Sequence, residues 1–155
     1  MKKLLLVLAF ACIVPFSWGA EIYTEIDSST LMRMMRNEGY SVSLDSDADI
    51  VWKKDGIKSY IIFSDGNERC NSIYFRCGFS FDGDKVADAV VQCNEYNSKY
   101  KFGKAYVEVK DGKYAVVFQY PFILRGGVTK ERIQYFFKEC IDFFGDWKKT
   151  VVDPL

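Results

Sequence analysis

"KAYVEVKDGKYAVVFQYPF", residues 104–122, decides the fold, because it consists of two alternating runs joined by a turn dipeptide. Asp111-Gly112 between two such runs is the strongest hairpin signal in the chain. Alternation weakens in "YAVVFQY", residues 114–120, where both faces are largely apolar. We expect this strand to lie in the centre of its sheet and to be covered on two sides.

Two stretches upstream of the hairpin also have the composition of strands. "DIVWKKDGIKSYIIF", residues 49–63, and "NSIYFRCGFSF", residues 71–81, are rich in β-branched and aromatic residues. The turn dipeptides Asp55-Gly56 and Asp65-Gly66 punctuate them. The pattern predicts three antiparallel strands in this part of the chain.

Helical periodicity occurs before, between and after these strands. The residues expected to cap the three helices are Asp27 or Ser28, Asp82 or Asp84, and Thr129. Gly39 ends the first helix. The residues expected to share the buried faces are Leu31, Met34 and Met35, then Val86, Val90, Cys93 and Asn97, then Ile133, Phe136, Phe137, Cys140, Ile141 and Phe144.

The resulting order is α-β-β-β-α-β-β-α, which predicts an α+β domain with helices packed on a mostly antiparallel sheet. The chain has 155 residues, of which 49% are hydrophobic, enough for one domain with a full core. Aromatic residues make up 17% of the chain and fall on apolar faces, so we expect most of them to serve packing.

The first residues, "MKKLLLVLAFACIVPFSWGA", have the pattern of a secretory signal peptide. Lys2 and Lys3 precede an apolar stretch, and small residues precede a cleavage site between Gly19 and Ala20. We expect a signal peptide at 1–19, a domain at 20–155, and export to the periplasm or the outside. Two weaker alternatives are a lipoprotein acylated at Cys12 and an uncleaved anchor, for which the thirteen apolar residues fall short of the roughly 20 that span a bilayer.

Charge and composition exclude several classes of function. Removing Lys2 and Lys3 leaves 19 basic against 21 acidic residues, a net charge near −2. We therefore expect no nucleic acid partner, and no run of Lys and Arg indicates attraction to a membrane surface. The chain has no histidine. This excludes Ser-His-Asp and Cys-His nucleophilic sites and mixed Cys/His zinc sites, leaving carboxylates and thiols.

In an oxidising compartment the cysteines of the exported chain would form a structural disulfide or remain as buried thiols. These residues are Cys70, Cys77, Cys93 and Cys140, which allow three fully paired connectivities. Their spacing lacks the C-x-x-C pattern of redox and zinc sites, so we expect no metal.

Two short motifs imitate ligand sites. "DSDAD", residues 45–49, resembles the start of a calcium loop, but Ile50 and Gly56 stand where the loop needs glycine and glutamate. We expect an acidic turn. "RGGVT" places Arg125, Gly126 and Gly127 before a helix, where free N–H groups can bind an anion; a tight reversal of the chain is the simpler role.

The end of the second helix gathers two asparagines and two tyrosines. Asn94 and Asn97 share a helical face, and Tyr96 and Tyr100 form a neighbouring aromatic pair. Asparagine prefers helix ends, where its amide bonds exposed backbone groups. We expect a structural corner in which Asn97 ties the helix to the hairpin, with a partner-binding site as the alternative.

These motifs resemble the YbjN-domain family of bacterial sensory-transduction regulators. The resemblance rests on "NEYNSKYKFGKAY", residues 94–106, on "GGVTKERI", residues 126–133, and on "CNSIYFRCGF", residues 70–79. It implies a type III secretion chaperone-like fold, no established enzyme activity, no cofactor, and a binding or regulatory role. Exported members often pair the cysteine at Cys70 with one near Ser64, which is absent here, so the resemblance suggests another cysteine in its place.

Our leading hypothesis is a non-enzymatic binding or regulatory protein of the bacterial cell envelope that engages a protein partner or a second copy of itself. The expected modes are pairing at a sheet edge or docking of an apolar segment. The alternatives are a small exported hydrolase using paired carboxylates or a thiol, and a structural envelope component whose dimer interface is its function.

Overall fold

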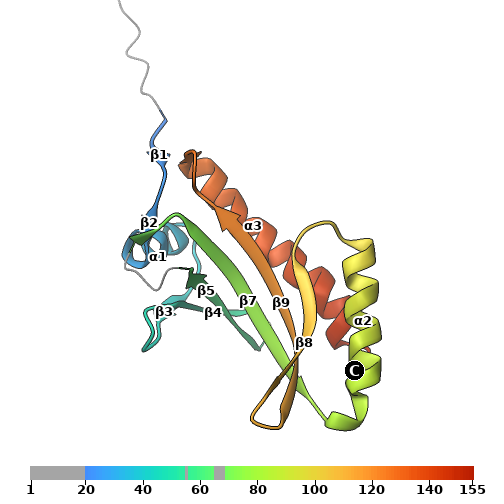
Figure 1. Cartoon of the computed structure of the whole chain (residues 1–155). Helices are drawn as coiled ribbons and strands as arrows, with labels where there is room; N and C mark the ends of the chain where they lie inside the picture. The colour runs from blue at the N-terminus through green and yellow to red at the C-terminus, as the bar shows by residue number, and fades with distance from the viewer. Residues whose placement is uncertain (1–19, 55, 65–68) are drawn as a thin grey trace, which may run out of the picture.

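The computed structural model describes residues 20–54, 56–64 and 69–155, and within these ranges the strands form one large sheet and two small ones. The six-stranded antiparallel sheet has the order β3-β4-β5-β7-β9-β8 (Figure 1). Its strands are β3 (Val42–Leu44), β4 (Ile50–Lys54), β5 (Ile57–Phe63), β7 (Ser72–Phe81), β9 (Lys113–Ile123) and β8 (Lys104–Lys110). The small sheets pair β1 (Ile22–Tyr23) with β10 (Val128–Thr129) and β2 (Ile26–Asp27) with β6 (Arg69–Cys70).

The helices of the same ranges are α1 (Ser28–Asn37), α2 (Val86–Lys99) and α3 (Lys130–Trp147), with a short 3₁₀ helix η1 (Gly83–Lys85) and a short π-helix η2 (Lys148–Val152). The predicted α+β class and the order α-β-β-β-α-β-β-α are confirmed for the long elements. Strands β1, β2, β3, β6 and β10 were missed because two or three residues are too few to show alternation.

Helix α1 begins and ends as its sequence predicts. The carboxylate of Asp27 accepts a hydrogen bond from the Thr30 N–H at 2.7 Å. Gly39 follows the helix with φ of +86°, a conformation that glycine adopts without strain. Leu31, Met34 and Met35 are buried. Helix α3 is capped by Thr129, whose hydroxyl accepts from the Arg132 N–H at 3.3 Å.

Helix α2 differs from its prediction in both cap and face. It is preceded by η1, and the side chains of Asp82 and Lys85, which lie at the two cap positions, make no capping hydrogen bond. Its buried residues are Ala89, Cys93 and Tyr96. The predicted face included Val90, which is 43% exposed. The predicted helical period was correct, but the buried face of α2 is rotated relative to the predicted one. The reason is that the small side chain of Ala89 allows the helix to pack more closely on the sheet than the sequence pattern indicates.

The predicted β8–β9 hairpin is present. Lys110 pairs with Lys113, and the two residues between them, Asp111 and Gly112, have φ of +51° and +72°. Positive φ at both positions is the turn geometry that matches the twist of a hairpin. In the β4–β5 hairpin Lys54 pairs with Ile57. Asp55 and the predicted Asp65-Gly66 turn lie outside the described residues, as do the cleavage site and Cys12.

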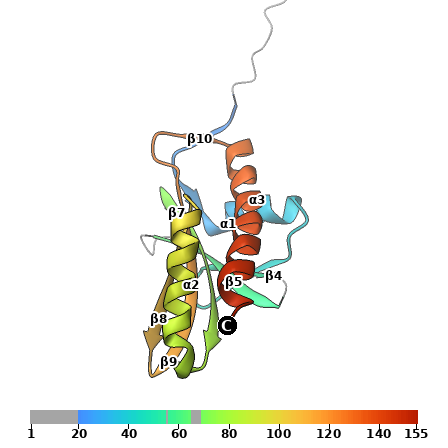
Figure 2. The same cartoon turned by 90° about the vertical axis from the view of Figure 1, so that its right-hand side faces the viewer.

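Helices α2 and α3 pack on one face of the large sheet, which we call the helical face. Tyr96 of α2 contacts Phe118 of β9, and Phe136 of α3 stacks on Phe122 at 4.5 Å between ring centroids. In Figure 1 α3 runs behind β9, and Figure 2 shows α2 and α3 from the side of the molecule. The core therefore lies between the sheet and this helical layer.

We expected both faces of the strand at residues 114–120 to be covered by other elements. This expectation is wrong for the face opposite the helices. In the described chain β9 lies between β7 and β8, with helices on its helical face only. Val117 on the opposite face is nevertheless 2% exposed. Side chains of neighbouring strands shield it, as described next.

Candidate functional site

The face of the large sheet opposite α2 and α3, here called the open face, is defined by its cross-strand register. Residues directly opposite each other on paired strands point to the same side. One such row crosses all the strands of the sheet and consists of Ser43, Val51, Tyr60, Arg76, Gln119 and Lys104. Tyr74 and Tyr106 lie two residues from members of this row and so share its face.

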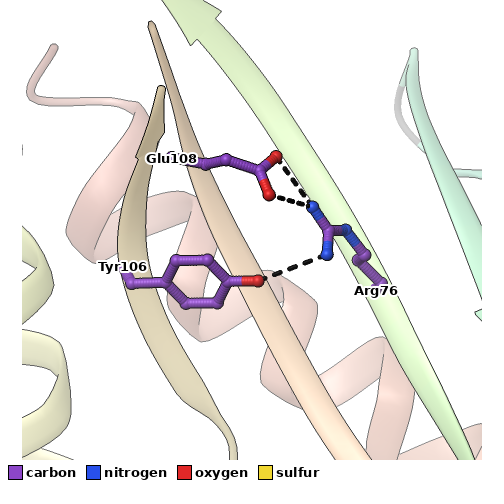
Figure 3. A network of polar contacts seen from close by, with 3 residues as sticks. All are labelled: Arg76, Tyr106 and Glu108. Atoms are coloured by element: carbon purple, nitrogen blue, oxygen red, sulfur yellow. Dashed lines mark hydrogen bonds and ion pairs between the residues drawn. The ribbon is translucent and has the colours of Figure 1, made fainter. Parts of the chain in front are cut away.

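A polar network extends across the open face from the central strand β7 to the edge strand β8 (Figure 3). Nη2 of Arg76 donates to both carboxylate oxygens of Glu108 at 2.8 Å, and Nη1 of Arg76 donates to the Tyr106 hydroxyl at 3.3 Å. Arg76 comes from β7 and the other two from β8, so the network bridges β9 and covers Val117. This bridge explains why an apolar side chain is buried on a face without a helix.

The surroundings of the network shift its ionisation in opposing ways. Burial lowers the pKa of Arg76, but the hydrogen bonds that it donates to Glu108 and the nearby Tyr106, Glu108 and Tyr74 outweigh this effect, so the pKa rises above its ordinary value. Burial raises the pKa of Tyr106. At neutral pH the arginine is therefore a fixed cation and the tyrosine a neutral hydroxyl.

The open face is strongly basic. Of the side chains that the structure describes, those at the strand positions of this face include one carboxylate, Glu108, and six cations. The cations are Lys53, Lys58, Arg76, Lys104, Lys110 and Lys113. Two further carboxylates, Asp45 and Asp49, lie just beyond the paired residues of β3 and β4, at positions that alternate with Ser43 and Val51 of this face. Two ammonium groups lie over tyrosine rings, Lys58 over Tyr60 at 4.9 Å and Lys104 over Tyr106 at 5.5 Å from the centroid. Such contacts hold the lysines against the sheet.

Sequence reasoning missed this surface. The basic residues are separated along the chain, so no run of Lys and Arg is visible. They gather because each occupies an alternate position of a strand, and because the register aligns those positions. The signal that could have found them is a charge count for each face of each predicted strand.

The residues at the end of α2 form a corner on the helical face. The amide of Asn97 donates to the Ala105 carbonyl at 2.8 Å and accepts from the Ala105 N–H at 2.9 Å. Tyr96 is buried and stacks on Tyr100 at 4.6 Å between ring centroids, whereas Asn94 is exposed. These are the contacts expected of a tether between helix and hairpin.

Arg125, Gly126 and Gly127 form a turn between β9 and β10. Both glycines have φ of +93°, and the Gly127 N–H donates to the Leu124 carbonyl at 2.9 Å. Val128 and Thr129 separate them from α3, so their N–H groups do not belong to its first turn. The geometry is that of a tight reversal, and it lies apart in the sequence from both the open face and the α2 corner.

The cysteines of the described ranges, Cys70, Cys77, Cys93 and Cys140, are buried. Cys77, Cys93 and Cys140 carry free thiols, so none of the three replaces the disulfide partner that the family resemblance suggested for Cys70. Burial raises the pKa of the Cys93 thiol to about 11 and also raises the pKa values of Cys77 and Cys140. The Cys70 thiol donates to the Ser72 carbonyl at 3.0 Å. Thiols in this state are poor nucleophiles.

The acidic motif at residues 45–49 is an ordered turn. The Asp45 carboxylate accepts from the N–H groups of Asp47 and Asp49, both at 3.0 Å. Nowhere in the described parts of the chain do three potential metal ligands gather. In the same parts no helix combines the length and the hydropathy needed to cross a bilayer.

The fold and the site define a one-sided α+β domain, with a helical layer on one face of an antiparallel sheet and a basic, tyrosine-bearing surface on the other. The chain belongs to the YbjN family, described as "Putative bacterial sensory transduction regulator", whose sequence model matches residues 27–144. No curated protein matches the chain in sequence.

Solved structures share this fold. One is the crystal structure of YbjN, "a putative transcription regulator from E. coli", with a TM-score of 0.71 and 17% identity over 82% of this chain and 91% of that one. Another is an uncharacterized protein from Methanothermobacter thermautotrophicus, with a TM-score of 0.52 and 12% identity over 83% of this chain and 99% of that one. At these identities the likeness is one of fold.

Proposed function

We propose that this protein is a non-enzymatic regulatory protein that binds a protein partner through the open face of its sheet. The observation that carries the proposal is the open face itself, on which tyrosines and cations lie opposite the helical layer. A sheet with one face available is a common way to present a broad, rigid surface.

The composition of the open face fits a protein interface. Protein interfaces are enriched in tyrosine and arginine, and their apolar centre is surrounded by a polar rim. Here Arg76 and Tyr106 lie on the two strands that flank Val117, and Tyr74 lies two residues from Arg76 on the same face of β7. Lys110 and Lys113 lie at its margin, next to the hairpin turn. Tyrosine adds contact area at low cost in conformational entropy, which suits a recognition surface.

Burial of the thiols supports a non-enzymatic function. A hydrolase using a thiol would need an accessible cysteine with a lowered pKa. Cys77, Cys93 and Cys140 are buried and their pKa values are raised.

The signal-like residues 1–19 extend the proposal to location. The protein acts in the periplasm or outside the cell after cleavage between Gly19 and Ala20. Fractionation of cells expressing the full chain, followed by N-terminal sequencing, checks this. Recovery in the cytoplasm with Met1 intact would contradict it.

Photo-crosslinking in cells tests the binding surface. A photoreactive residue at Tyr74 or Gln119 of the open face is compared with one at Tyr135, an exposed position on α3. We expect one discrete adduct from the open face that is absent from Tyr135, and that is lost when Arg76→Glu is introduced beside the probe. Adducts that are equal at all three positions would contradict the proposal.

A further inference from the structure

We propose that the partner presents an acidic, extended protein segment to the open face, and that its carboxylates compete with Glu108 for Arg76. This inference rests on the proposed function and adds the chemistry of the partner. It also makes Glu108 an internal competitor that holds Arg76 in place until the partner binds.

The first support is the separation of charge in the molecule. The open face carries six basic residues and, with Asp45 and Asp49 just beyond β3 and β4, three acidic residues, a surplus of three positive charges. Residues 20–155 contain 19 basic and 21 acidic residues. The part of this chain outside the open face therefore has 13 basic and 18 acidic residues. A nearly neutral protein with one basic face attracts a partner whose charge is negative at that face.

The second support is that Arg76 already binds a carboxylate of its own chain, that of Glu108. Nη2 of Arg76 donates to both oxygens of one carboxylate in charge-assisted hydrogen bonds, which shows that the guanidinium is placed to bind such a group. The side chains of Arg76 and Glu108 are 29% and 38% exposed. An ion pair at this exposure contributes only about 0 to 1 kcal/mol, so exchange of Glu108 for a partner carboxylate costs little. The Tyr106 hydroxyl continues to position the guanidinium during the exchange.

The shape of the face favours an extended segment. The row from Lys104 to Ser43 crosses six strands, a distance of about 24 Å at the usual strand spacing. An extended chain of about seven residues covers that length. At the far end, beside Lys53 and Val51, the surface is hollowed, with room for about 180 Å³. One side chain of the segment would fit there.

The tyrosines favour a protein segment over single-stranded nucleic acid. Binding of single strands uses aromatic rings whose faces are open for base stacking. On the open face the ammonium groups of Lys58 and Lys104 lie over the rings of Tyr60 and Tyr106. Those ring faces are occupied, whereas the ammonium groups remain available to carboxylates.

The test measures binding of a defined probe by fluorescence anisotropy with the purified protein. The probe is a labelled peptide in which glutamate alternates with serine and valine, and the matched control peptide has glutamine in place of glutamate. We expect Arg76→Gln to weaken binding about fivefold, and Glu108→Gln to tighten it by about the same factor, since one change removes and the other releases an exposed charge. Lys138→Gln, the same charge change on α3, serves as the protein control and leaves binding unchanged.

The opposite signs of the two variants make the test decisive, because a general loss of folding would weaken both. Affinity for the glutamate peptide should also fall as salt is added. A Glu108→Gln variant that binds no more tightly overturns the proposal. Tighter binding of a thymidine oligonucleotide or of phosphatidylglycerol vesicles than of the peptide also overturns it, in favour of that class of partner. If the peptide does not bind while crosslinking from Gln119 yields a protein adduct, the inference of an acidic partner is wrong, but the open face remains the proposed binding surface. If the peptide does not bind and no adduct forms, the proposed function is wrong as well.

Discussion

Arg76 on β7 bonds Glu108 on β8 although the two strands are not neighbours, because β9 lies between them. The pair reaches over Val117, whose exposed fraction is 2%. The same contact therefore shields an apolar residue and fixes a cation at the centre of the open face. We expect this contact to be stronger than an ordinary surface pair.

A double-mutant cycle measures that difference. We expect a coupling free energy of about 0.5 to 1 kcal/mol between Arg76→Gln and Glu108→Gln, since Nη2 of Arg76 donates to both carboxylate oxygens and the pair is half-buried. Arg69 and Glu25, whose side chains are 63% and 48% exposed, provide the control pair, and their coupling should be near zero. Urea unfolding gives both values. Equal coupling in the two cycles would show that the bridge over β9 adds nothing.

Asn97→Ala should destabilise the protein by about 1 to 3 kcal/mol, because it leaves the N–H and C=O of Ala105 without their partner. Ala105 is 2% exposed, so water replaces the amide poorly. Asn94→Ala, at an exposed position of the same helix, is the matched control. Equal unfolding midpoints for the two variants would show that Asn97 does not act as a tether between the helix and the hairpin.

Gly103→Ala should cost more than Gly112→Ala, although both glycines have positive φ, of +77° and +72°. The backbone strain of an L-residue is common to both, on the order of 1 kcal/mol. A methyl group at Gly103 also overlaps the Phe118 ring, whereas nothing lies within 4 Å of one at Gly112. We expect the overlap to add about 1 to 3 kcal/mol in thermal or urea unfolding. An equal loss of stability in both variants would show that backbone strain alone accounts for the destabilisation.

Asp27 should make the stability of the protein depend on pH in the acid range. Burial raises the pKa of this carboxyl, but hydrogen bonds from Ser29 and Thr30 together outweigh it, so the pKa lies below the ordinary 3.8. A lowered pKa stabilises the folded state above pH 3.8, and this contribution is lost as pH falls through the folded-state pKa. Asp27→Asn retains a capping side chain without the charge. We expect the wild type to lose its advantage over Asp27→Asn on acidification, whereas a constant difference in urea unfolding would contradict this.

The thiols of Cys77, Cys93 and Cys140 should resist alkylation in the native protein at neutral pH and react fully after unfolding. Burial and raised pKa values both suppress the reactive thiolate. Mass spectrometry after iodoacetamide treatment, with and without denaturant, counts the modified residues. Rapid native labelling of any one of the three would reopen thiol chemistry as a function.

The long elements were predictable because local chemistry determines them. Asp27 and Thr129 are helix caps wherever they precede a helical stripe, and Asp111-Gly112 requires a hairpin almost regardless of context. The buried face of α2 was not predictable in the same way. Whether Ala89 or Val90 faces the sheet depends on how closely the helix approaches, which is a property of tertiary packing.

The open face could not be read from the sequence because it depends on register. The neighbours of Arg76 on this face, Tyr60 and Gln119, are 16 and 43 positions away along the chain, and only strand pairing joins them. The corner at Asn97 could be predicted from the sequence because its partner, Ala105, is only eight residues away. Local contacts leave a trace in spacing, whereas a surface assembled across six strands does not.

The hydrogen bonds of Asn97 have one further consequence, which concerns the rim of the sheet. β8 is a terminal strand, and the N–H and C=O of Ala105 point away from β9 and would be the first rung for a strand of another molecule. The side-chain amide of Asn97 bonds both of these groups, so they are not available to a strand of another molecule. The protein can thus present a broad face to a partner while one of its edges is guarded against self-templated growth into fibrils.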